Sequence, residues 1–429
     1  MIKIIGAGLA GCEAACFLGS KGVEVELIDM KPKSFTPAHS SEFFAELVCS
    51  NSLKSDDVYG NACGLLKEEL RRLGSVTMAA AEVSRVPAGG ALAVDRDAFA
   101  AFVTEKIKTC PQIKVTCAEV KELPEEGIIA TGPLTAGPLY EDIQRRFGGA
   151  LHFYDASAPV VSAESIDLAH TFTGDRYGKG TGDYINCPLN KEEYEQFVSE
   201  LLAAEKVELH SFEKREIFEG CMPVEVMASR GKDTLRFGTF KPVGLYDGDG
   251  KRPYAVLQLR KENKEGTSYG LVGCQTNLKF QEQKRVFSLI PALKNAEFER
   301  YGVMHRNTYL NAPEVLDPDF SVKTQHMLYF AGQITGVEGY VESAMSGLLA
   351  AIHVWNKLCG RDSIIPEDTC VCGALSRYVA TPNKYFEPMN ANYGILRGGI
   401  LSRDKGEKRR LIAERALGEI ERFKKIIQL

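Results

Sequence analysis

Two cysteines lie in polar, loop-like segments where a thiol can serve as a nucleophile. Cys49 belongs to the segment 46–54, which ends at Lys54, a positive charge close enough in sequence to favour the thiolate. Cys221 follows a glycine and lies two residues before a proline, in a turn between apolar runs. A cysteine is also a good small buried apolar residue, so composition alone leaves both interpretations open for this pair.

A glycine-rich loop near the start of the chain is suited to binding phosphate. Gly6-Ala7-Gly8-Leu9-Ala10-Gly11 is a complete G-x-G-x-x-G motif. The first glycine allows a tight turn, the second lets a pyrophosphate approach the backbone, and the third lets a helix lie close to a sheet. The N–H groups that begin the following helix would then face the phosphates.

The elements around this loop are those that a dinucleotide site requires. Residues 1–5 form a short apolar run that predicts a strand, 12–21 predict a helix, and 23–28 alternate as a second strand. The second strand ends at Asp29, whose carboxylate can accept hydrogen bonds from a ribose diol. Strand, helix, second strand and terminal acid therefore agree on a βαβ dinucleotide-binding unit.

Two later strands end in small residues and predict further contacts with the same cofactor. The run 127–133 ends with Thr131 and Gly132, a strand ending that is frequent in FAD proteins of the glutathione-reductase type. The run 327–333 ends with Gly332 and Gln333, and a glycine-rich loop to Tyr340 and a long helix over 341–358 follow. We expect these pieces to contact the phosphate and the ring of FAD.

We therefore predict an α/β protein with a Rossmann-type, glutathione-reductase-like FAD-binding domain. This domain is discontinuous, comprising residues 1–185 and 320–429, and a strand-rich α+β domain over 186–319 is inserted into it. The segment 43–48, before Cys49, predicts a short helix. Asn190 and Glu193 predict a capping box at the start of another helix.

Composition limits the classes of function. The 429 residues carry a formal net charge of −5, which gives no global sign of a nucleic-acid binder. Between residues 230 and 306, however, fifteen Lys and Arg stand against eight Asp and Glu. This local excess suits an anionic ligand larger than a cofactor, although a solvated face explains the charge equally well.

The cysteine count and the hydropathy pattern also carry expectations. In a cytosolic enzyme of this size, we expect the twelve cysteines to be free, and we expect no metal site. There is no run of about 18 apolar residues, so we expect no membrane span. The first predicted strand begins at Met1, which argues against a signal peptide and for the cytoplasm.

The sequence resembles the folate- and FAD-dependent tRNA (uracil-5-)-methyltransferases, the TrmFO family, over nearly its whole length. These enzymes look like shorter relatives of the MnmG/GidA flavoproteins, which modify the wobble uridine. The motifs that carry the resemblance are segments 6–11, 47–54, 130–135, 186–189, 218–228, 241–245, 251–256, 301–308, 332–343 and 388–392. Two positions depart from the pattern: Asp29 stands where Glu is expected, and Asn277 where His is expected.

The resemblance implies a reaction and roles for particular residues. Methylenetetrahydrofolate would supply a one-carbon unit to C5 of a uridine, reduced FAD would supply a hydride, and NADPH, or NADH, would re-reduce the flavin. Cys221 matches the thiol that attacks uracil C6, and Cys49 matches a second active-site cysteine, a base for the C5 proton or a partner of the one-carbon unit. Tyr340 matches an aromatic residue that stacks on the isoalloxazine.

The family points to uridine 54 in the T-loop of tRNA, and a ribosomal RNA uridine is the alternative target. Candidate RNA-binding residues in the basic region are Arg230, Lys241, Lys251, Arg252, Lys284, Arg285 and Arg306. No second G-x-G-x-x-G follows a strand, so the nicotinamide would bind transiently near the flavin, in the pocket that also takes folate. Competing hypotheses are a flavin oxidoreductase that acts on a small molecule and a flavin-containing RNA-binding protein without catalytic activity.

Overall fold

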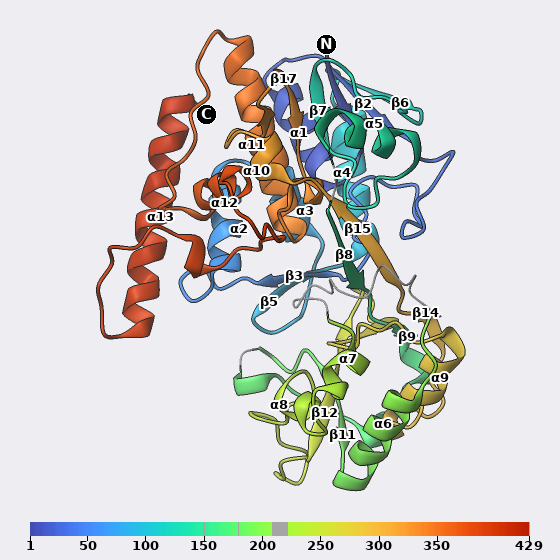
Figure 1. Ribbon diagram of the computed structural model, residues 1–429. Helices are drawn as coiled ribbons and strands as arrows, with labels where there is room; N and C mark the ends of the chain where they lie inside the picture. Colours follow the sequence, from blue (N-terminus) through green and yellow to red (C-terminus); the bar gives the residue numbers. More distant parts are fainter. Residues whose placement is uncertain (149–150, 179, 208–221, 429) are drawn as a thin grey trace.

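The computed structural model describes residues 1–148, 151–178, 180–207 and 222–428, which form two lobes (Figure 1). The upper lobe in Figure 1 is built on a six-stranded sheet in the order β16-β17-β7-β1-β2-β6. These strands are β16 (Ser321–Val322), β17 (Gln325–Phe330), β7 (Gly127–Ile129), β1 (Ile2–Ile5), β2 (Val25–Asp29) and β6 (Ile113–Cys117). β16 pairs antiparallel with β17, and the other neighbours pair in parallel. The predicted Rossmann-type α/β fold is confirmed.

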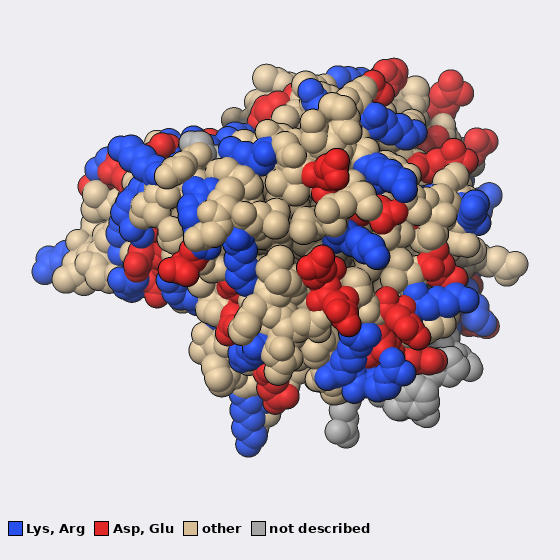
Figure 2. Space-filling view, turned by 90° about the horizontal axis from the view of Figure 1, so that it is seen from above, with Lys and Arg blue, Asp and Glu red and all other residues tan. Residues whose placement is uncertain are grey.

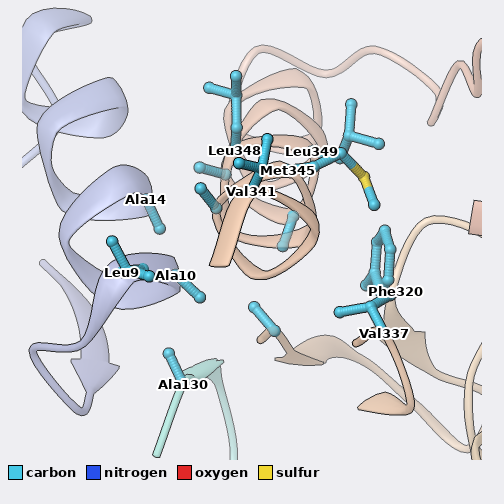
Figure 3. Packing of buried hydrophobic residues seen from close by; sticks show 14 of the residues in the cluster. Leu9, Ala10, Ala14, Ala130, Phe320, Val337, Val341, Met345, Leu348 and Leu349 are labelled. Carbon is cyan, nitrogen blue, oxygen red and sulfur yellow. The ribbon is translucent and has the colours of Figure 1, made fainter. Parts of the chain in front are cut away.

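Helices α1 (Leu9–Ser20) and α11 (Tyr340–Leu358) pack directly on each other beside this sheet. Figure 3 shows Ala10 of α1 and Val341 of α11 among the small and branched side chains at this contact. A Cβ at Gly347 would lie 2.2 Å from the carbonyl oxygen of Ala10, so only glycine permits this approach. The close packing brings the glycine-rich loops before the two helices to the same end of the sheet.

The remaining elements of the upper lobe surround this centre. The helices are α2 (Ala62–Arg72), α3 (Val76–Val83), α4 (Arg96–Thr109), α5 (Gly137–Phe147), α10 (Ala312–Val315), α12 (Val371–Ala380) and α13 (Lys405–Ile427). A small sheet has the order β3-β5-β4, with β3 (Ser52–Ser55), β5 (Ala91–Val94) and β4 (Arg85–Val86). β3 directly follows the Cys49 segment, so this small sheet helps to anchor it.

The lower lobe has its own antiparallel sheet, in the order β10-β11-β12-β13-β9-β14. Its strands are β9 (Val160–Ser162), β10 (Phe172–Thr173), β11 (Ile185–Leu189), β12 (Ala255–Lys261), β13 (Ser268–Leu271) and β14 (Phe298–Arg300). Its helices are α6 (Lys191–Ala203), α7 (Val224–Ser229), α8 (Thr234–Phe237) and α9 (Phe280–Phe287). The predicted capping box at Asn190 and Glu193 is present at the start of α6.

Two antiparallel strands, β8 (Leu151–Ala156) and β15 (Met304–Tyr309), run between the lobes (Figure 1). The inserted domain was predicted to begin at residue 186. β9 and β10 precede that residue, yet both pair with strands of the lower sheet. The buried apolar residues of the lower lobe form a cluster of their own. We therefore propose that the inserted domain spans residues 157–303, and we call it the inserted unit below.

The short helix predicted over residues 43–48 is absent, and this prediction is wrong. The main chain there bonds to other elements instead of to itself: the N–H of Phe44 donates to Oγ1 of Thr104 at 2.8 Å, and that of Ala45 to the carbonyl of Ala7 at 2.9 Å. Ala45 also has a φ of 52°, which a right-handed helix excludes. Tertiary hydrogen bonds therefore outweigh the local helical pattern.

Candidate functional site

One pocket opens at the end of the upper sheet where the two glycine-rich loops meet, with about 1330 Å³ of space not filled by atoms, including its mouth. Nearly all the residues predicted to bind the cofactor line it: Gly6, Ala7, Gly8, Leu9, Ala10, Asp29, Thr131, Gly132, Gly332, Gln333 and Tyr340. They come from the ends of four sheet strands and from the starts of α1 and α11. Parallel strands end on the same edge of a sheet, and this places such distant segments together.

The first loop is shaped to receive phosphate. Gly8 precedes α1 as its N-cap, and no atom lies within 4 Å of the position that a Cβ on Gly8 would take. Gly11 does not line the pocket; a Cβ there would lie 1.8 Å from the carbonyl oxygen of Gly6, so glycine is needed to close the turn. The helix begins at Leu9, earlier than the predicted Cys12, and its first N–H groups therefore face the pocket.

Asp29 joins the loop to the end of β2. Its Oδ2 accepts the N–H of Ala7 at 2.6 Å and its Oδ1 accepts the N–H of Lys31 at 2.9 Å. Each carboxylate oxygen can accept more than one hydrogen bond, so both remain able to take a ribose hydroxyl. Asp29 thus fits the role that the sequence predicted for it while also fixing the glycine loop.

The pocket has further lining residues that sequence reasoning missed. Lys31 forms an ion pair with Glu46 at 2.8 Å, and Nζ of Lys31 also donates to the carbonyl of Phe43. Both members of the pair line the pocket beside His39. Their sequence neighbourhood is a loop without periodicity, so only the fold reveals that residues 31 and 46 meet.

The second loop contributes a buried acid that the sequence did not single out. Glu338 accepts a hydrogen bond from the side-chain amide of Gln333. Burial raises the pKa of Glu338 to about 8, and the nearby carboxylate of Asp155 adds to the rise. An acidic residue within a glycine-rich loop next to Tyr340 is the signal by which it could have been found.

Cys49 is attached to this second loop through its backbone. The N–H groups of Cys49 and Ser50 both donate to the hydroxyl of Tyr340, at 2.8 and 3.1 Å. Tyr340 also lines the pocket, so a single side chain connects the pocket to the cysteine. The resemblance gave each of these residues a separate role, and the fold places them in direct contact across 291 positions of sequence.

The predicted thiolate at Cys49 is not favoured by this geometry. Burial raises the pKa of the Cys49 thiol, and the carboxylate of Asp155 raises it further, while Arg96 opposes them. The ammonium of Lys54 instead lies 3.9 Å from the carboxylate of Glu342. Lys54 is therefore close to Cys49 in sequence, but its ammonium pairs with Glu342 and is not among the main groups that lower the pKa of the Cys49 thiol.

Cys221 lies outside the described residues, so its predicted role stays a prediction. The chain is described again from Met222, and the N–H of Val224 donates to the carbonyl of Gln275 at 2.7 Å. Asn277 lies two residues after Gln275, and its side-chain amide donates to the carbonyl of Val207 at 3.0 Å. The residue that replaces the expected histidine is therefore engaged in the packing of the inserted unit.

The predicted RNA-binding residues are spread around the inserted unit. Lys241, Lys251 and Arg252 lie in the loop after α8, whereas Lys284 and Arg285 lie on α9 at the other side of the lower lobe (Figure 1). Arg230 follows α7 and Arg306 lies on β15. Arg285 pairs with both Glu200 and Glu282, so its charge is compensated. A single basic face containing all seven residues is not formed.

The face seen from above in Figure 2 mixes positive and negative side chains. Among the residues that the structure describes, no group of three or more His, Cys, Asp and Glu is placed to hold a metal ion. In the same part of the chain, no helix has both the length and the apolar character needed to cross a membrane.

Comparison with known proteins decides the family. A protein of Acetivibrio thermocellus named methylenetetrahydrofolate–tRNA-(uracil-5-)-methyltransferase TrmFO is 56% identical over 428 residues, 98% of each chain. The protein of the same name from Geobacter sulfurreducens is 54% identical over 430 residues, again 98% of each chain. This chain belongs to the TrmFO family.

The wider relationship agrees with this assignment. The family model described as glucose inhibited division protein A matches residues 1–362 of this TrmFO family member. The solved structure of GidA from Aquifex aeolicus, in its form II crystal, matches 99% of this chain and 73% of that one with a TM-score of 0.71. Sequence identity is only 15%, so this likeness shows the shared fold.

Proposed function

We propose that this chain methylates C5 of a uridine in tRNA, uridine 54 of the T-loop. The one-carbon donor is 5,10-methylenetetrahydrofolate, the hydride donor is reduced FAD, and NADPH or NADH re-reduces the flavin. The relatives that are more than half identical carry a name that specifies methylenetetrahydrofolate, tRNA and C5 of uracil. The observation that carries the proposal is the contact between the Cys49 backbone and Tyr340 at the edge of the dinucleotide pocket.

The residues of the pocket fit FAD. Gly8 leaves open space at the start of α1 for a pyrophosphate, and Asp29 offers carboxylate oxygens to a ribose. Gln333 and Tyr340 line the pocket, and Tyr340 also contacts the backbone of Cys49. Bound in its reduced state, FAD supplies the hydride that takes a carbon from the formaldehyde level to a methyl group.

The cysteines supply the covalent step of the proposal. C5 of uracil is a poor nucleophile, and addition of the Cys221 thiolate to C6 moves an electron pair to C5. C5 then forms a bond to the one-carbon unit, the C5 proton is removed, and tetrahydrofolate leaves that carbon. Addition of the hydride to the same carbon and cleavage of the S–C6 bond give the methyl group and restore the ring and the Cys221 thiolate. Cys49 is the proposed second active-site cysteine, as a base for the C5 proton or as a partner of the one-carbon unit. Two buried acids, Glu338 and Glu342, lie on either side of Tyr340 in the sequence.

The test is an assay with purified protein, unmodified tRNA transcript, methylenetetrahydrofolate and NADPH, with 5-methyluridine measured by mass spectrometry. We expect product at one T-loop uridine from the wild type and none from Cys221→Ala, with FAD bound to both. Cys359→Ala, which removes an exposed cysteine outside the pocket, serves as the matched control and keeps activity.

Absence of product from a wild-type protein that binds FAD and oxidises NADPH would contradict the tRNA proposal. The same assay with ribosomal RNA transcript then tests the alternative target. Replacing NADPH by NADH in the productive reaction identifies the reductant.

A further inference from the structure

Side chains of both lobes form hydrogen bonds with the segment that carries Cys49. On the upper lobe, Tyr340 accepts the N–H groups of Cys49 and Ser50. From the inserted unit, the guanidinium of Arg260 donates through Nη2 to Oγ of Ser50 at 2.9 Å and through Nε to Oδ1 of Asn51 at 2.8 Å. We call Ser50, Asn51 and Arg260 the clamp.

Asn51 is the centre of the clamp and is fully buried. Its side-chain NH₂ donates to the carbonyl of Val94 in the upper lobe at 3.0 Å and to that of Lys261 in the inserted unit at 2.8 Å. Its Oδ1 takes the Arg260 bond, so every strong hydrogen-bonding group of this amide is used. Loss of one of these partners would leave a polar atom of the buried amide without a hydrogen bond, which costs free energy. The clamp therefore favours the one arrangement of the two lobes in which all these bonds form.

The position of Arg260 is fixed by the sheet of the inserted unit. It lies on β12, which pairs with β11 on one side and with β13 on the other, where Arg260 is opposite Gly270. A strand held on both sides cannot shift alone, so the guanidinium moves only with its sheet. The fork of Nε and Nη2 binds two acceptors in a set geometry, which a lysine cannot reproduce.

A second connection runs beside the clamp. Arg96 at the start of α4 forms an ion pair with Glu262 of the inserted unit at 2.7 Å. The same guanidinium donates to the carbonyl of Leu47 at 3.1 Å, two residues before Cys49. The chain around the cysteine is thus attached to the inserted unit at both of its ends.

We infer that Arg260 is a positioning residue, through which the inserted unit holds Cys49 at the edge of the flavin pocket. The inference rests on the proposed function in one respect, namely that Cys49 acts there. It goes further because it makes the place of the cysteine depend on the lobe that is proposed to meet the RNA. Breaking the clamp would release the Cys49 segment while leaving the glycine loops of the pocket intact.

The test is the rate at which iodoacetamide alkylates Cys49 in the FAD-loaded protein, followed by peptide mass spectrometry. We expect Arg260→Ala to raise this rate at least about tenfold, because two hydrogen bonds from a charged group are lost. Alkylation of Cys63 and Cys117, both in the upper lobe, should stay at the wild-type rate, which separates local release from general loosening. Lys294→Ala, an exposed charge of the inserted unit, is the control and should leave the Cys49 rate unchanged.

An unchanged Cys49 rate in Arg260→Ala, or an equal rise at all three cysteines, would overturn the inference. If Arg260→Ala does not fold, Arg260→Lys decides, since it keeps the charge but lacks the planar fork that meets both acceptors in a fixed geometry; a smaller rise supports the inference and no rise overturns it. Alkylation needs neither RNA nor turnover, so a failure of the methylation assay and a failure of this inference can be told apart.

Discussion

At the residue scale, a buried carboxylate acts as a helix cap far from the site. Glu69 accepts the N–H groups of Val371 and Cys372, the first residues of α12, both at 2.8 Å. Burial raises the pKa of Glu69 to about 7, although these hydrogen bonds oppose the rise. The neutral form is therefore favoured in the folded protein well above the pH at which an exposed glutamate ionises.

This shift predicts how stability depends on pH. A raised folded-state pKa contributes stability that is complete below about pH 4.5 and is lost as the pH rises through about 7. Relative to Glu69→Gln, the free energy of unfolding of the wild type should therefore fall by about 3 kcal/mol over that window. Urea unfolding at several pH values measures this difference, and Glu105→Gln, on the exposed face of α4, should parallel the wild type. A constant difference between the wild type and Glu69→Gln would show that the carboxyl does not titrate there.

At the element scale, the close approach of α1 and α11 determines the shape of the pocket. Gly347 lies against the carbonyl of Ala10, and Ala10, in the first turn of α1, lines the pocket. An added methyl group at residue 347 must push the two helices apart, because interiors are close-packed and the obstacle is backbone. Helix packing and cofactor binding therefore share this one contact.

We expect Gly347→Ala to destabilise the protein by about 1–3 kcal/mol and to weaken FAD binding. Gly418→Ala is the matched control, since Gly418 also lies inside a helix, α13, but no atom lies within 4 Å of its Cβ position. That change should be neutral or stabilise by about 0.5–1 kcal/mol through helix propensity. Urea unfolding and FAD titration by fluorescence provide the two readouts. Equal behaviour of the two variants would refute the packing argument.

At the scale of the whole molecule, charge is distributed unevenly over the inserted unit. Lys251 and Arg252 are exposed in the loop after α8. Arg285, on the opposite side, is already neutralised by Glu200 and Glu282. RNA attracted by charge alone should therefore meet the loop side in preference to α9.

The double variant Lys251→Ala/Arg252→Ala should weaken tRNA binding and lower the slope of log K against log salt by about 1–2. Arg285→Ala should leave this slope close to that of the wild type, because its partners already compensate its charge. Filter binding of a tRNA transcript at several salt concentrations measures both variants. A larger effect from Arg285→Ala would place the RNA on the α9 side instead.

Much of the fold and of the pocket followed from local sequence. The strand, glycine loop, helix and second strand of residues 1–29 are contiguous, so the local pattern was enough to predict the whole unit. The same strand, loop and helix order recurs at 327–358 and predicted the second glycine-rich loop. The predicted cofactor residues other than Gly11 met in one pocket because parallel strands end on one edge of a sheet. The family resemblance added separate roles for Cys49 and Tyr340, and their contact is seen only in the structure.

Contacts between distant segments were decided only by the tertiary structure. The segment 43–48 has a helical pattern but bonds to α4 and to the glycine loop, and Lys54 pairs with Glu342 instead of supporting a thiolate at Cys49. The clamp of Arg260 on Asn51 joins residues 209 positions apart. Sequence patterns record which face of an element is buried, whereas hydrogen bonds and the pKa values that depend on burial arise only when separate elements meet.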